Sequence, residues 1–208
     1  MPVKVDEETI ARGLRFLSRR DRELAQVLQA LGPPQLWSRE PGFASLVHIM
    51  LEQQVSLASA LAVFNRLSAL VSPLTPEGFM KTGDAALRAI GFSRQKIAHV
   101  RHLAESIREG SLDLSALSEL SDEEVRARLL RIKGIGNWTA DIYLLRVLGR
   151  PDAWPSGDLA LAVAAERIKQ LDHRPTPAEL EALSLQWRPW RSVAARLLWH
   201  YYLNGPKK

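Results

Sequence analysis

A short glycine turn between two apolar segments is the first feature of this sequence that suggests chemistry. Glu123–Ile132 and Trp138–Leu148 both carry apolar residues at close to helical spacing. Gly134 and Gly136 lie between them, and glycine lets the backbone adopt positive φ and approach a partner closely. The first N–H groups of the second helix would point out of the turn, where the helix dipole attracts an anion. The pattern predicts an anion-binding helix–hairpin–helix, and a plain packing corner between two helices is the alternative.

A single carboxylate, Asp158, follows the second helix after a loop that contains Pro155–Gly157. A fixed carboxylate can stabilise a developing positive charge, and it can orient or deprotonate an attacking water. Its place before an apolar helical segment is also typical of a helix N-cap. The two roles are compatible, so Asp158 is both a candidate catalytic residue and a candidate cap.

Composition favours a basic protein with a polyanionic partner. The 208 residues carry a formal net charge of +5, and 46% are hydrophobic, which is enough for a core. There is no cysteine, which excludes disulfides, a cysteine-ligated zinc site and an iron–sulfur cluster. The N-terminus does not resemble a signal peptide, and no apolar run approaches the roughly 18 residues of a membrane span. We therefore expect a cytoplasmic protein that does not enter a membrane.

The apolar pattern is helical almost throughout, and no segment alternates as a strand does. Thr75 before Pro76 predicts a capped helix start, and Ser121 with Glu124 predicts a capping box. Pro189 is expected to begin the last helix. These signals predict an all-α fold of about ten to twelve helices.

Four segments, taken in order, resemble one family. They are Glu52–Ser56, Gly134–Ala140, Trp154–Leu159 and Trp187–Ser192 leading to Trp199. Together they are similar to the helix–hairpin–helix (HhH-GPD) DNA glycosylases, and within that superfamily to the 3-methyladenine DNA glycosylase II branch. The resemblance runs from about Phe43 to Tyr202. Larger bacterial members carry an additional N-terminal β-rich domain, so this chain resembles a compact member that lacks it.

The resemblance implies a single glycosylase core over residues 1–208 with two helical lobes. We expect one lobe to comprise residues 41–134 and the other residues 1–40 with 135–208, with the DNA and the active site in the cleft between them. The implied partner is double-stranded DNA with a flipped damaged base. The protein is expected to act as a monomer without a cofactor.

For the chemistry, the resemblance implies that Asp158 is catalytic and that Trp138 and Trp199 line the base pocket, where an aromatic face stacks well on a cationic base. Tyr143 and Phe43 are weaker pocket candidates. A tryptophan at a helical position is otherwise most often a core residue. Lyase-competent relatives similar to endonuclease III carry a Schiff-base lysine where this chain has Trp138, and tryptophan cannot form an imine.

For DNA binding, the family places Gln54 where a side chain fills the gap left by the flipped base. A helix-capping role for the pair Gln53 and Gln54 is the alternative. The implied phosphate grip uses the backbone of the hairpin, with a contribution from a hydroxyl, and consists of Lys133, Gly134, Ile135, Gly136 and Thr139. Relatives often bind a monovalent metal ion through hairpin carbonyls, here those of Ile132 and Gly134.

These implications predict a monofunctional DNA glycosylase. It would hydrolyse the N-glycosidic bond of alkylated bases, of the 3-methyladenine and 7-methylguanine type, in base excision repair. The alternative function is a non-catalytic helix–hairpin–helix module that only binds DNA, which would explain the hairpin and the charge but not Asp158 with its tryptophans.

Overall fold

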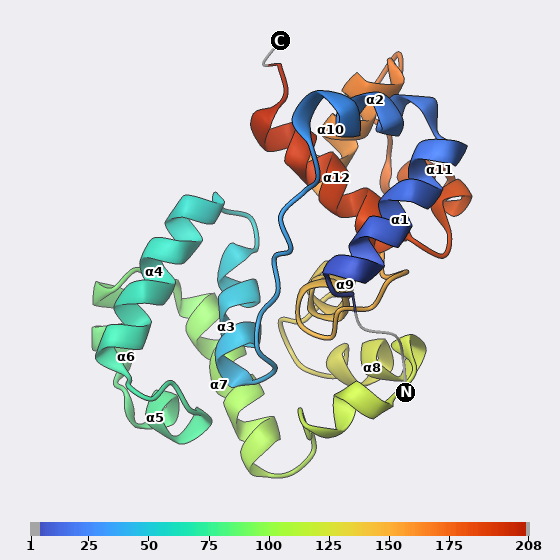
Figure 1. Cartoon of the computed structure of the whole chain (residues 1–208). Helices are drawn as coiled ribbons and strands as arrows, with labels where there is room; N and C mark the ends of the chain where they lie inside the picture. The colour runs from blue at the N-terminus through green and yellow to red at the C-terminus, as the bar shows by residue number, and fades with distance from the viewer. Residues whose placement is uncertain (1–4, 207–208) are drawn as a thin grey trace. The chain divides into compact units, whose positions relative to one another are not determined.

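The computed structural model describes residues 5–206, and this part of the chain is helical (Figure 1). It contains twelve α-helices and two short 3-10 helices, with no β-strand among the described residues. The expected all-α fold is confirmed. In the same range, no helix combines the length and the apolar character that crossing a membrane requires.

The chain divides into two compact units. The middle unit is Arg39–Tyr143, and the terminal unit combines Met1–Ser38 with Leu144–Lys208. The boundary lies within α9 (Asn137–Arg146), because the hairpin and the start of this helix pack with the middle segment. The expected lobes divide after residue 134, whereas in this division α9 continues the middle unit beyond the glycine turn.

The terminal unit is organised around its last helix, α12 (Arg191–Asn204), which packs against α1, α2 and α10. Every residue of α12 from its first to Trp199 is buried. The other helices of the unit are α1 (Glu7–Arg20), α2 (Arg22–Leu31), α10 (Leu159–Lys169), α11 (Pro177–Ser184) and the 3-10 helix η2 (Leu185–Trp187).

A buried carboxylate joins three segments of this unit. Asp21 caps α2 by accepting the N–H of Leu24, and it also accepts from Lys169 Nζ at 2.6 Å and from the indole N–H of Trp187 at 2.7 Å. These hydrogen bonds lower the pKa of Asp21 against the opposing effect of its burial. Because three distant segments converge on one charge, the start of α2, the end of α10 and η2 hold one another in place.

The middle unit packs α3 (Phe43–Glu52) against α4 (Leu57–Leu70) and α7 (Arg94–Arg108). Phe43 is 7% exposed and meets the fully buried Phe79 edge-on, with 6.2 Å between ring centroids. The remaining elements of the unit are α5 (Pro76–Lys81), α6 (Asp84–Ala89), the 3-10 helix η1 (Ala116–Glu119), α8 (Asp122–Leu129) and the first part of α9.

Local helix-start signals proved accurate where a side chain makes the cap. Thr75 caps α5 with Pro76 in its first turn, and Ser121 with Glu124 forms the capping box of α8. The expected start of the last helix at Pro189 is wrong, because α12 begins at Arg191. The Trp190 N–H donates to the carbonyl of Trp187 at 2.8 Å, so the turn of η2 runs on past the proline before α12 begins.

Candidate functional site

Asp158 lies at the start of α10 with its carboxylate held from two directions. Its Oδ1 accepts the backbone N–H of Leu161 at 3.0 Å, which caps the helix, and the indole N–H of Trp199 at 3.1 Å. The residue is 8% exposed. The expected N-cap role is therefore confirmed, and the same geometry leaves a rigid, largely dehydrated carboxylate at a helix N-terminus.

The loop before Asp158 fixes where this carboxylate stands. The Asp158 N–H donates to the carbonyl of Pro155 at 3.0 Å, and the Ser156 N–H donates to that of Trp154 at 3.1 Å. Trp154 is buried against Trp187, with ring centroids 5.4 Å apart. The hydrogen-bonded turn and the packing of Trp154 on Trp187 together fix the position of the backbone where α10 begins.

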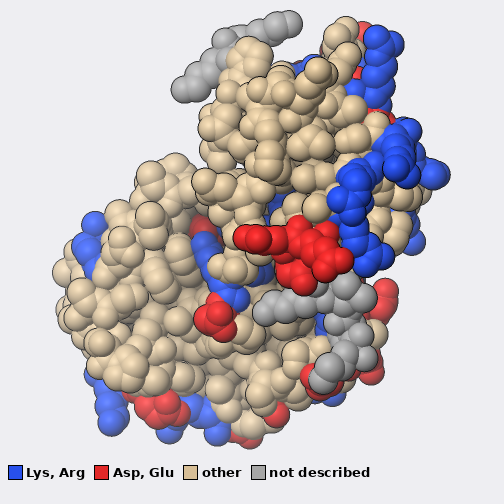
Figure 2. All heavy atoms as spheres, viewed as in Figure 1, with Lys and Arg blue, Asp and Glu red and all other residues tan. Residues whose placement is uncertain are grey.

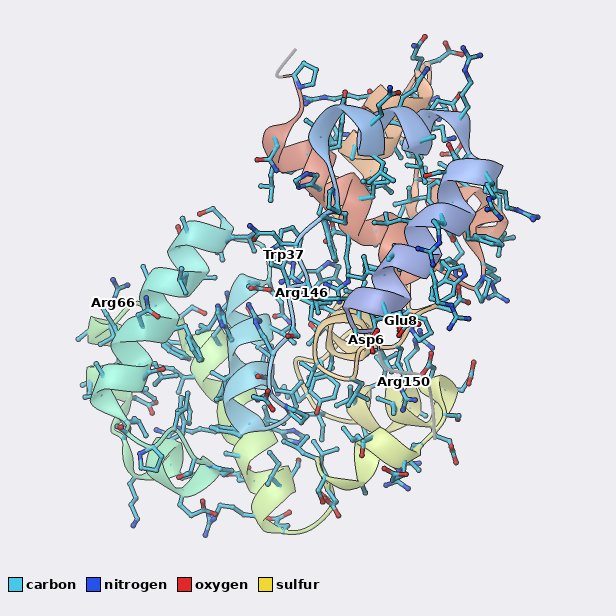
Figure 3. All side chains as sticks on the ribbon, viewed as in Figure 1. Asp6, Glu8, Trp37, Arg66, Arg146 and Arg150 are labelled. Carbon is cyan, nitrogen blue, oxygen red and sulfur yellow. The ribbon has the colours of Figure 1, made fainter. Side chains whose placement is uncertain are left out.

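Trp199, the hydrogen-bond partner of Asp158, contacts the ring of Trp37 and the guanidinium group of Arg146. Trp199 is 5% exposed and packs against Trp37, with ring centroids 6.2 Å apart and planes tilted by 48°. The Arg146 guanidinium lies 4.9 Å from the Trp199 ring centroid and 6.0 Å from that of Trp37, within the range of cation–π attraction (Figure 3). Trp199 therefore faces a permanent positive charge of the protein itself.

A second arginine, Arg196, is fully buried beside this group. It donates to the carbonyl of Trp37 at 3.0 Å and to that of Leu145 at 2.9 Å. Burial, and to a smaller degree the charge of Arg146, lowers the pKa of Arg196 to about 10, so it remains protonated at neutral pH. Arg196 thereby joins the segment that carries Trp37 to the end of α9.

Sequence reasoning missed Trp37, Arg146 and Arg196. One signal was available: Arg146 interrupts an otherwise apolar run at the end of α9, where a charge requires a reason. Trp37 comes from an irregular segment between α2 and α3, and nothing local ties it to Trp199.

The hairpin in the middle unit uses its two glycines for different reasons. Gly134 has φ +90°, and a Cβ there would lie 2.3 Å from the His99 ring, so no other residue fits. Gly136 is exposed, and a Cβ there would meet no atom within 4 Å. The first glycine is required by the fold, whereas the second leaves open space in front of the start of α9.

Three backbone N–H groups of this hairpin have no acceptor within residues 5–206, those of Gly134, Gly136 and Asn137. The Ile135 N–H donates to the carbonyl of Ile132 at 3.0 Å, and the Lys133 N–H donates to His102 Nδ1 at 3.2 Å. The backbone N–H groups of Ile135 and Lys133 therefore already have acceptors inside the protein. The Lys133 side chain itself is exposed.

Gln53 holds the hairpin to the end of α3. Its side-chain amide donates to the Gly134 carbonyl at 2.9 Å and to the Thr139 hydroxyl at 2.8 Å. Thr139 is 1% exposed, and that its hydroxyl contacts DNA stays a prediction. The expectation that Gln53 contacts DNA is replaced by a positioning role, since its amide N–H donors are engaged within the protein.

Gln54 differs from Gln53 in its exposure and in its backbone geometry. It is exposed, and its φ of 58° lies in the left-handed region that residues other than glycine seldom adopt. Lys96 Nζ donates to the carbonyls of Leu51 at 2.7 Å and Gln53 at 3.1 Å, and so ties the chain down just before it. The strained turn projects Gln54 into solvent next to the exposed Val55.

The remaining pocket candidates lie in different surroundings. Phe43 belongs to the core of the middle unit and packs on Phe79, and that it lines a pocket stays a prediction. Tyr143 is fully buried, which raises the pKa of its phenol to about 12, and its hydroxyl has no hydrogen-bond partner in the described part of the chain. Trp138 is half-buried in the first turn of α9.

The carbonyls of Ile132 and Gly134, the predicted ligands of a monovalent metal ion, are both engaged inside the protein. The first accepts from the Ile135 N–H and the second from Gln53, so each has already used one acceptor position.

Comparison with known proteins matches residues 47–189 to the model of the HhH-GPD superfamily of base excision DNA repair proteins. The chain belongs to this superfamily. The Bacillus subtilis protein YfjP is 36% identical over 124 residues, which are 60% of this chain and 43% of YfjP. DNA-3-methyladenine glycosylase 1 of Schizosaccharomyces pombe is 30% identical over 182 residues, which are 86% of this chain and 80% of that protein.

A solved structure agrees with these sequence relatives. The 3-methyladenine DNA glycosylase Mag1 of Schizosaccharomyces pombe, in complex with abasic DNA, superposes with a TM-score of 0.88 at 28% identity. The match covers 95% of this chain and all of that one. The family resemblance carried by the four sequence segments is thereby confirmed.

The hydrogen bonds of Gln53 generate a stability prediction. Gln53→Ala leaves the Gly134 carbonyl and the buried Thr139 hydroxyl without a donor, which should lower the free energy of unfolding by about 1–3 kcal/mol. Urea denaturation followed by circular dichroism measures the change. Gln54→Ala is the matched control and should stay within about 0.5 kcal/mol of the wild type, because Gln54 is exposed. Equal stability of the two variants would contradict the positioning role.

Proposed function

We propose that the protein is a monofunctional DNA glycosylase that releases alkylated bases, of the 3-methyladenine and 7-methylguanine type, in base excision repair. The observation that carries the proposal is the carboxylate of Asp158, buried at the N-terminus of α10 and fixed by the indole N–H of Trp199. Membership of the HhH-GPD superfamily and the likeness to 3-methyladenine glycosylases support it. We further propose that residues 1–208 form one glycosylase core that acts as a monomer on double-stranded DNA.

The reaction breaks the bond between C1′ of the sugar and the base nitrogen. The bonding electrons leave with the base, which an alkylated purine accepts readily because it already carries positive charge. The sugar passes through an oxocarbenium-like state, and the Asp158 carboxylate stabilises that charge. Water then bonds to C1′ and gives up a proton, which Asp158 accepts and returns to solvent. One carboxylate is sufficient because this leaving group needs no added proton.

A base inside a duplex must be extruded before this chemistry can begin, at a cost of a few kcal/mol. We propose that Trp138 and Trp199 form aromatic walls for the flipped base and that Gln54 fills the space it leaves. The exposed, left-handed backbone of Gln54 supports the wedge role. Arg146, which lies over Trp199, would stand at the edge of the same pocket.

The hairpin would hold the backbone of the DNA. The N–H groups of Gly134, Gly136 and Asn137 have no acceptor within residues 5–206, and the space beside Gly136 is open at the start of a helix, an arrangement that suits a phosphate oxygen. The exposed side chain of Lys133 adds a positive charge next to them. Such contacts position the duplex but carry no information about its sequence.

Replacing Asp158 tests the catalytic role directly. Asp158→Asn should slow base release from alkylated duplex DNA by at least about a hundredfold, because the charge that stabilises the transition state is lost. Asparagine is also a good N-cap, so the fold and the affinity for DNA should remain. Release of free methylated base, measured by chromatography under single-turnover conditions, is the readout. Wild-type protein that binds DNA but releases no base would instead indicate a non-catalytic DNA-binding module.

Trp199→Phe is the companion variant for the positioning of Asp158. It removes the indole N–H donor but keeps an aromatic ring at this position. We expect a partial loss of base release, smaller than that of Asp158→Asn, with no change in the affinity for undamaged duplex. A loss of duplex affinity equal to the loss of turnover would place Trp199 outside the site.

Trp138 generates a prediction about the product. Without a Schiff-base lysine at this position, sodium borohydride should trap no covalent complex between protein and DNA. The product should be an abasic strand that breaks only after alkali treatment, as seen on a denaturing gel. A trapped complex would overturn the monofunctional assignment, and Lys133→Ala would then be the first variant to examine.

Gly136 allows a test of the hairpin that leaves the fold intact. A Cβ at this position meets no protein atom, so Gly136→Val should fold normally while its side chain fills the space proposed for the phosphate. Affinity for damaged and undamaged duplexes should fall by a similar factor, of about tenfold, since phosphate contacts are common to both. Fluorescence anisotropy at fixed salt is the measurement. Unchanged affinity in a folded variant would contradict phosphate binding and indicate that the hairpin is only a packing corner between two helices.

A further inference from the structure

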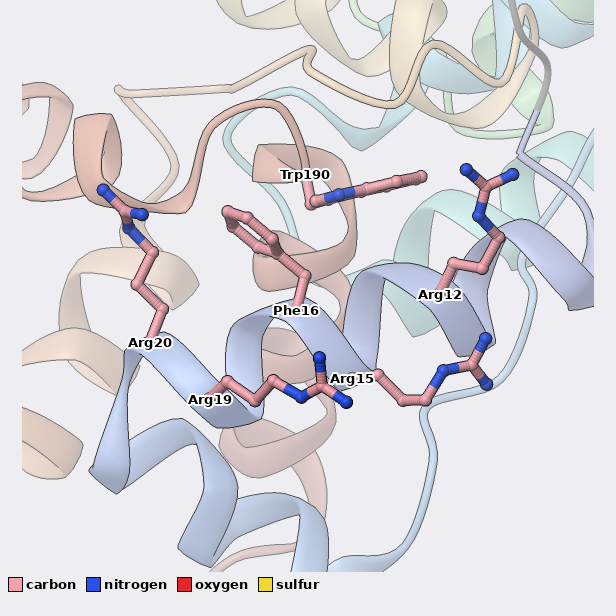
Figure 4. Close-up of a pocket in the computed structure, with 6 residues that line it drawn as sticks. All are labelled: Arg12, Arg15, Phe16, Arg19, Arg20 and Trp190. Carbon is pink, nitrogen blue, oxygen red and sulfur yellow. The ribbon is translucent and has the colours of Figure 1, made fainter.

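A cluster of arginines on α1 lies apart from the residues used above. Basic side chains, drawn blue in Figure 2, gather over this helix. They surround a cavity of about 540 Å³ on the terminal unit. Its lining, drawn in Figure 4, is Arg12, Arg15, Phe16, Arg19, Arg20 and Trp190. We call this the α1 pocket.

The helix geometry explains why these side chains converge. Residues three or four apart share one face of an α-helix, so Arg12, Arg19 and Arg20 all neighbour Phe16. Arg20 lies 5.7 Å from the Phe16 ring centroid, in cation–π contact. The opposite face of α1 is buried and includes Leu14. The arginines are therefore left on the side of the helix that faces solvent.

Trp190 reaches the α1 pocket because Gly13 makes room for it. A Cβ on Gly13 would lie 3.1 Å from the Trp190 ring and 2.8 Å from Val193, so α1 and the start of α12 approach as closely as their backbones permit. The Trp190 N–H is also held by the carbonyl of Trp187. The aromatic wall of the pocket is thus fixed by packing.

The N–H donors of the four guanidinium groups are not used inside the described part of the protein. Within residues 5–206, Arg12, Arg15, Arg19 and Arg20 make no hydrogen bond or ion pair, and all four are exposed. The carboxylates of Glu7 and Glu8 belong to the first turn of α1, and Glu8 lies one helical turn from Arg12. Arg15, Arg19 and Arg20 lie further along the helix, where like charges repel one another and an anionic ligand would relieve that repulsion.

We propose that the α1 pocket binds single-stranded DNA. Guanidinium groups pair with phosphate oxygens through two parallel hydrogen bonds, and aromatic faces stack on unpaired bases. Arg12, Arg15 and Arg19 follow one another along α1 at about 4.5 and 6 Å, a spacing that lets them follow a phosphate backbone. The bases of a duplex are already stacked and would leave Phe16 and Trp190 unused, whereas a single strand engages both the charges and the rings.

The test measures binding of a fluorescent thymidine 15-mer by anisotropy at several salt concentrations. Arg15→Glu/Arg19→Glu should weaken binding at least tenfold and reduce the slope of log affinity against log salt by about 1.4, because each phosphate contact contributes about 0.7. Phe16→Ala should weaken binding about fivefold or more without changing that slope. The two kinds of variant thereby separate charge from stacking.

The matched control carries the same change in net charge elsewhere on the terminal unit. Arg167→Glu/Arg174→Glu alters two arginines of another surface and should bind the oligonucleotide within twofold of the wild type. An equal loss in this control would show that only net charge matters, and would overturn the site. Binding that is unaffected by both Phe16→Ala and the Arg15/Arg19 variant would overturn it as well.

Two further measurements complete the design. A glutamate-rich peptide should not displace the 15-mer at equal concentration, and displacement that depends on Phe16 would identify an acidic protein segment as the occupant instead.

Base release from saturating alkylated duplex should remain within twofold of the wild type in the Arg15/Arg19 variant. A large fall in that rate would make α1 part of the catalytic site and contradict a separate one. Because oligonucleotide binding requires no catalysis, it tests the α1 pocket independently of the glycosylase proposal.

Discussion

The terminal unit depends on the way one buried carboxylate is shared between a helix and a tryptophan. Asp158 satisfies a free N–H at the start of α10 and holds the indole N–H of Trp199 on α12. The same contacts that join the two helices fix the position of the negative charge. A carboxylate kept at 8% exposure loses most of its hydration, and its partners compensate for that loss. Stability and proposed chemistry therefore rest on the same atom, and an asparagine separates them because it keeps the cap but removes the charge.

The hairpin of the middle unit solves the opposite problem. The backbone amides proposed to bind phosphate must stay unpaired, and nearby side chains engage other backbone groups of the hairpin. Gln53 engages the Gly134 carbonyl, and His102 engages the Lys133 N–H. His99 packs so closely on Gly134 that the left-handed backbone cannot relax. Burial, and then the nearby charge of Lys133, lowers the pKa of His99, which favours a neutral ring beside a surface proposed to bind an anion. The amides remain available because their neighbours are immobilised.

Features that a few adjacent residues determine were legible in the sequence. Cap residues such as Thr75 and Ser121 act on the helix that follows them, and the cap role of Asp158 was visible for the same reason. The glycines of the turn signalled a special backbone, although only Gly134 has positive φ. The burial of Thr139 and Phe43 was not legible in the sequence, because exposure depends on what packs over a residue and no local pattern records that.

Contacts between distant segments account for the remaining errors and omissions. Trp37 and Trp199 are far apart in the chain, and their pairing depends on Arg196 holding the carbonyl of Trp37. The sequence pattern also treats all arginines alike, whereas the fold gives them different physical roles. Arg196 is desolvated and uses its donors on backbone carbonyls inside the protein.

The arginines of α1 are solvated and leave their donors for a ligand. A net charge of +5 predicts that an anion will be attracted, but it does not say where the anion binds. That depends on which cations the fold leaves without an internal acceptor. On the terminal unit, the α1 pocket meets this condition, and its aromatic walls add a preference for ligands that carry rings as well as charge.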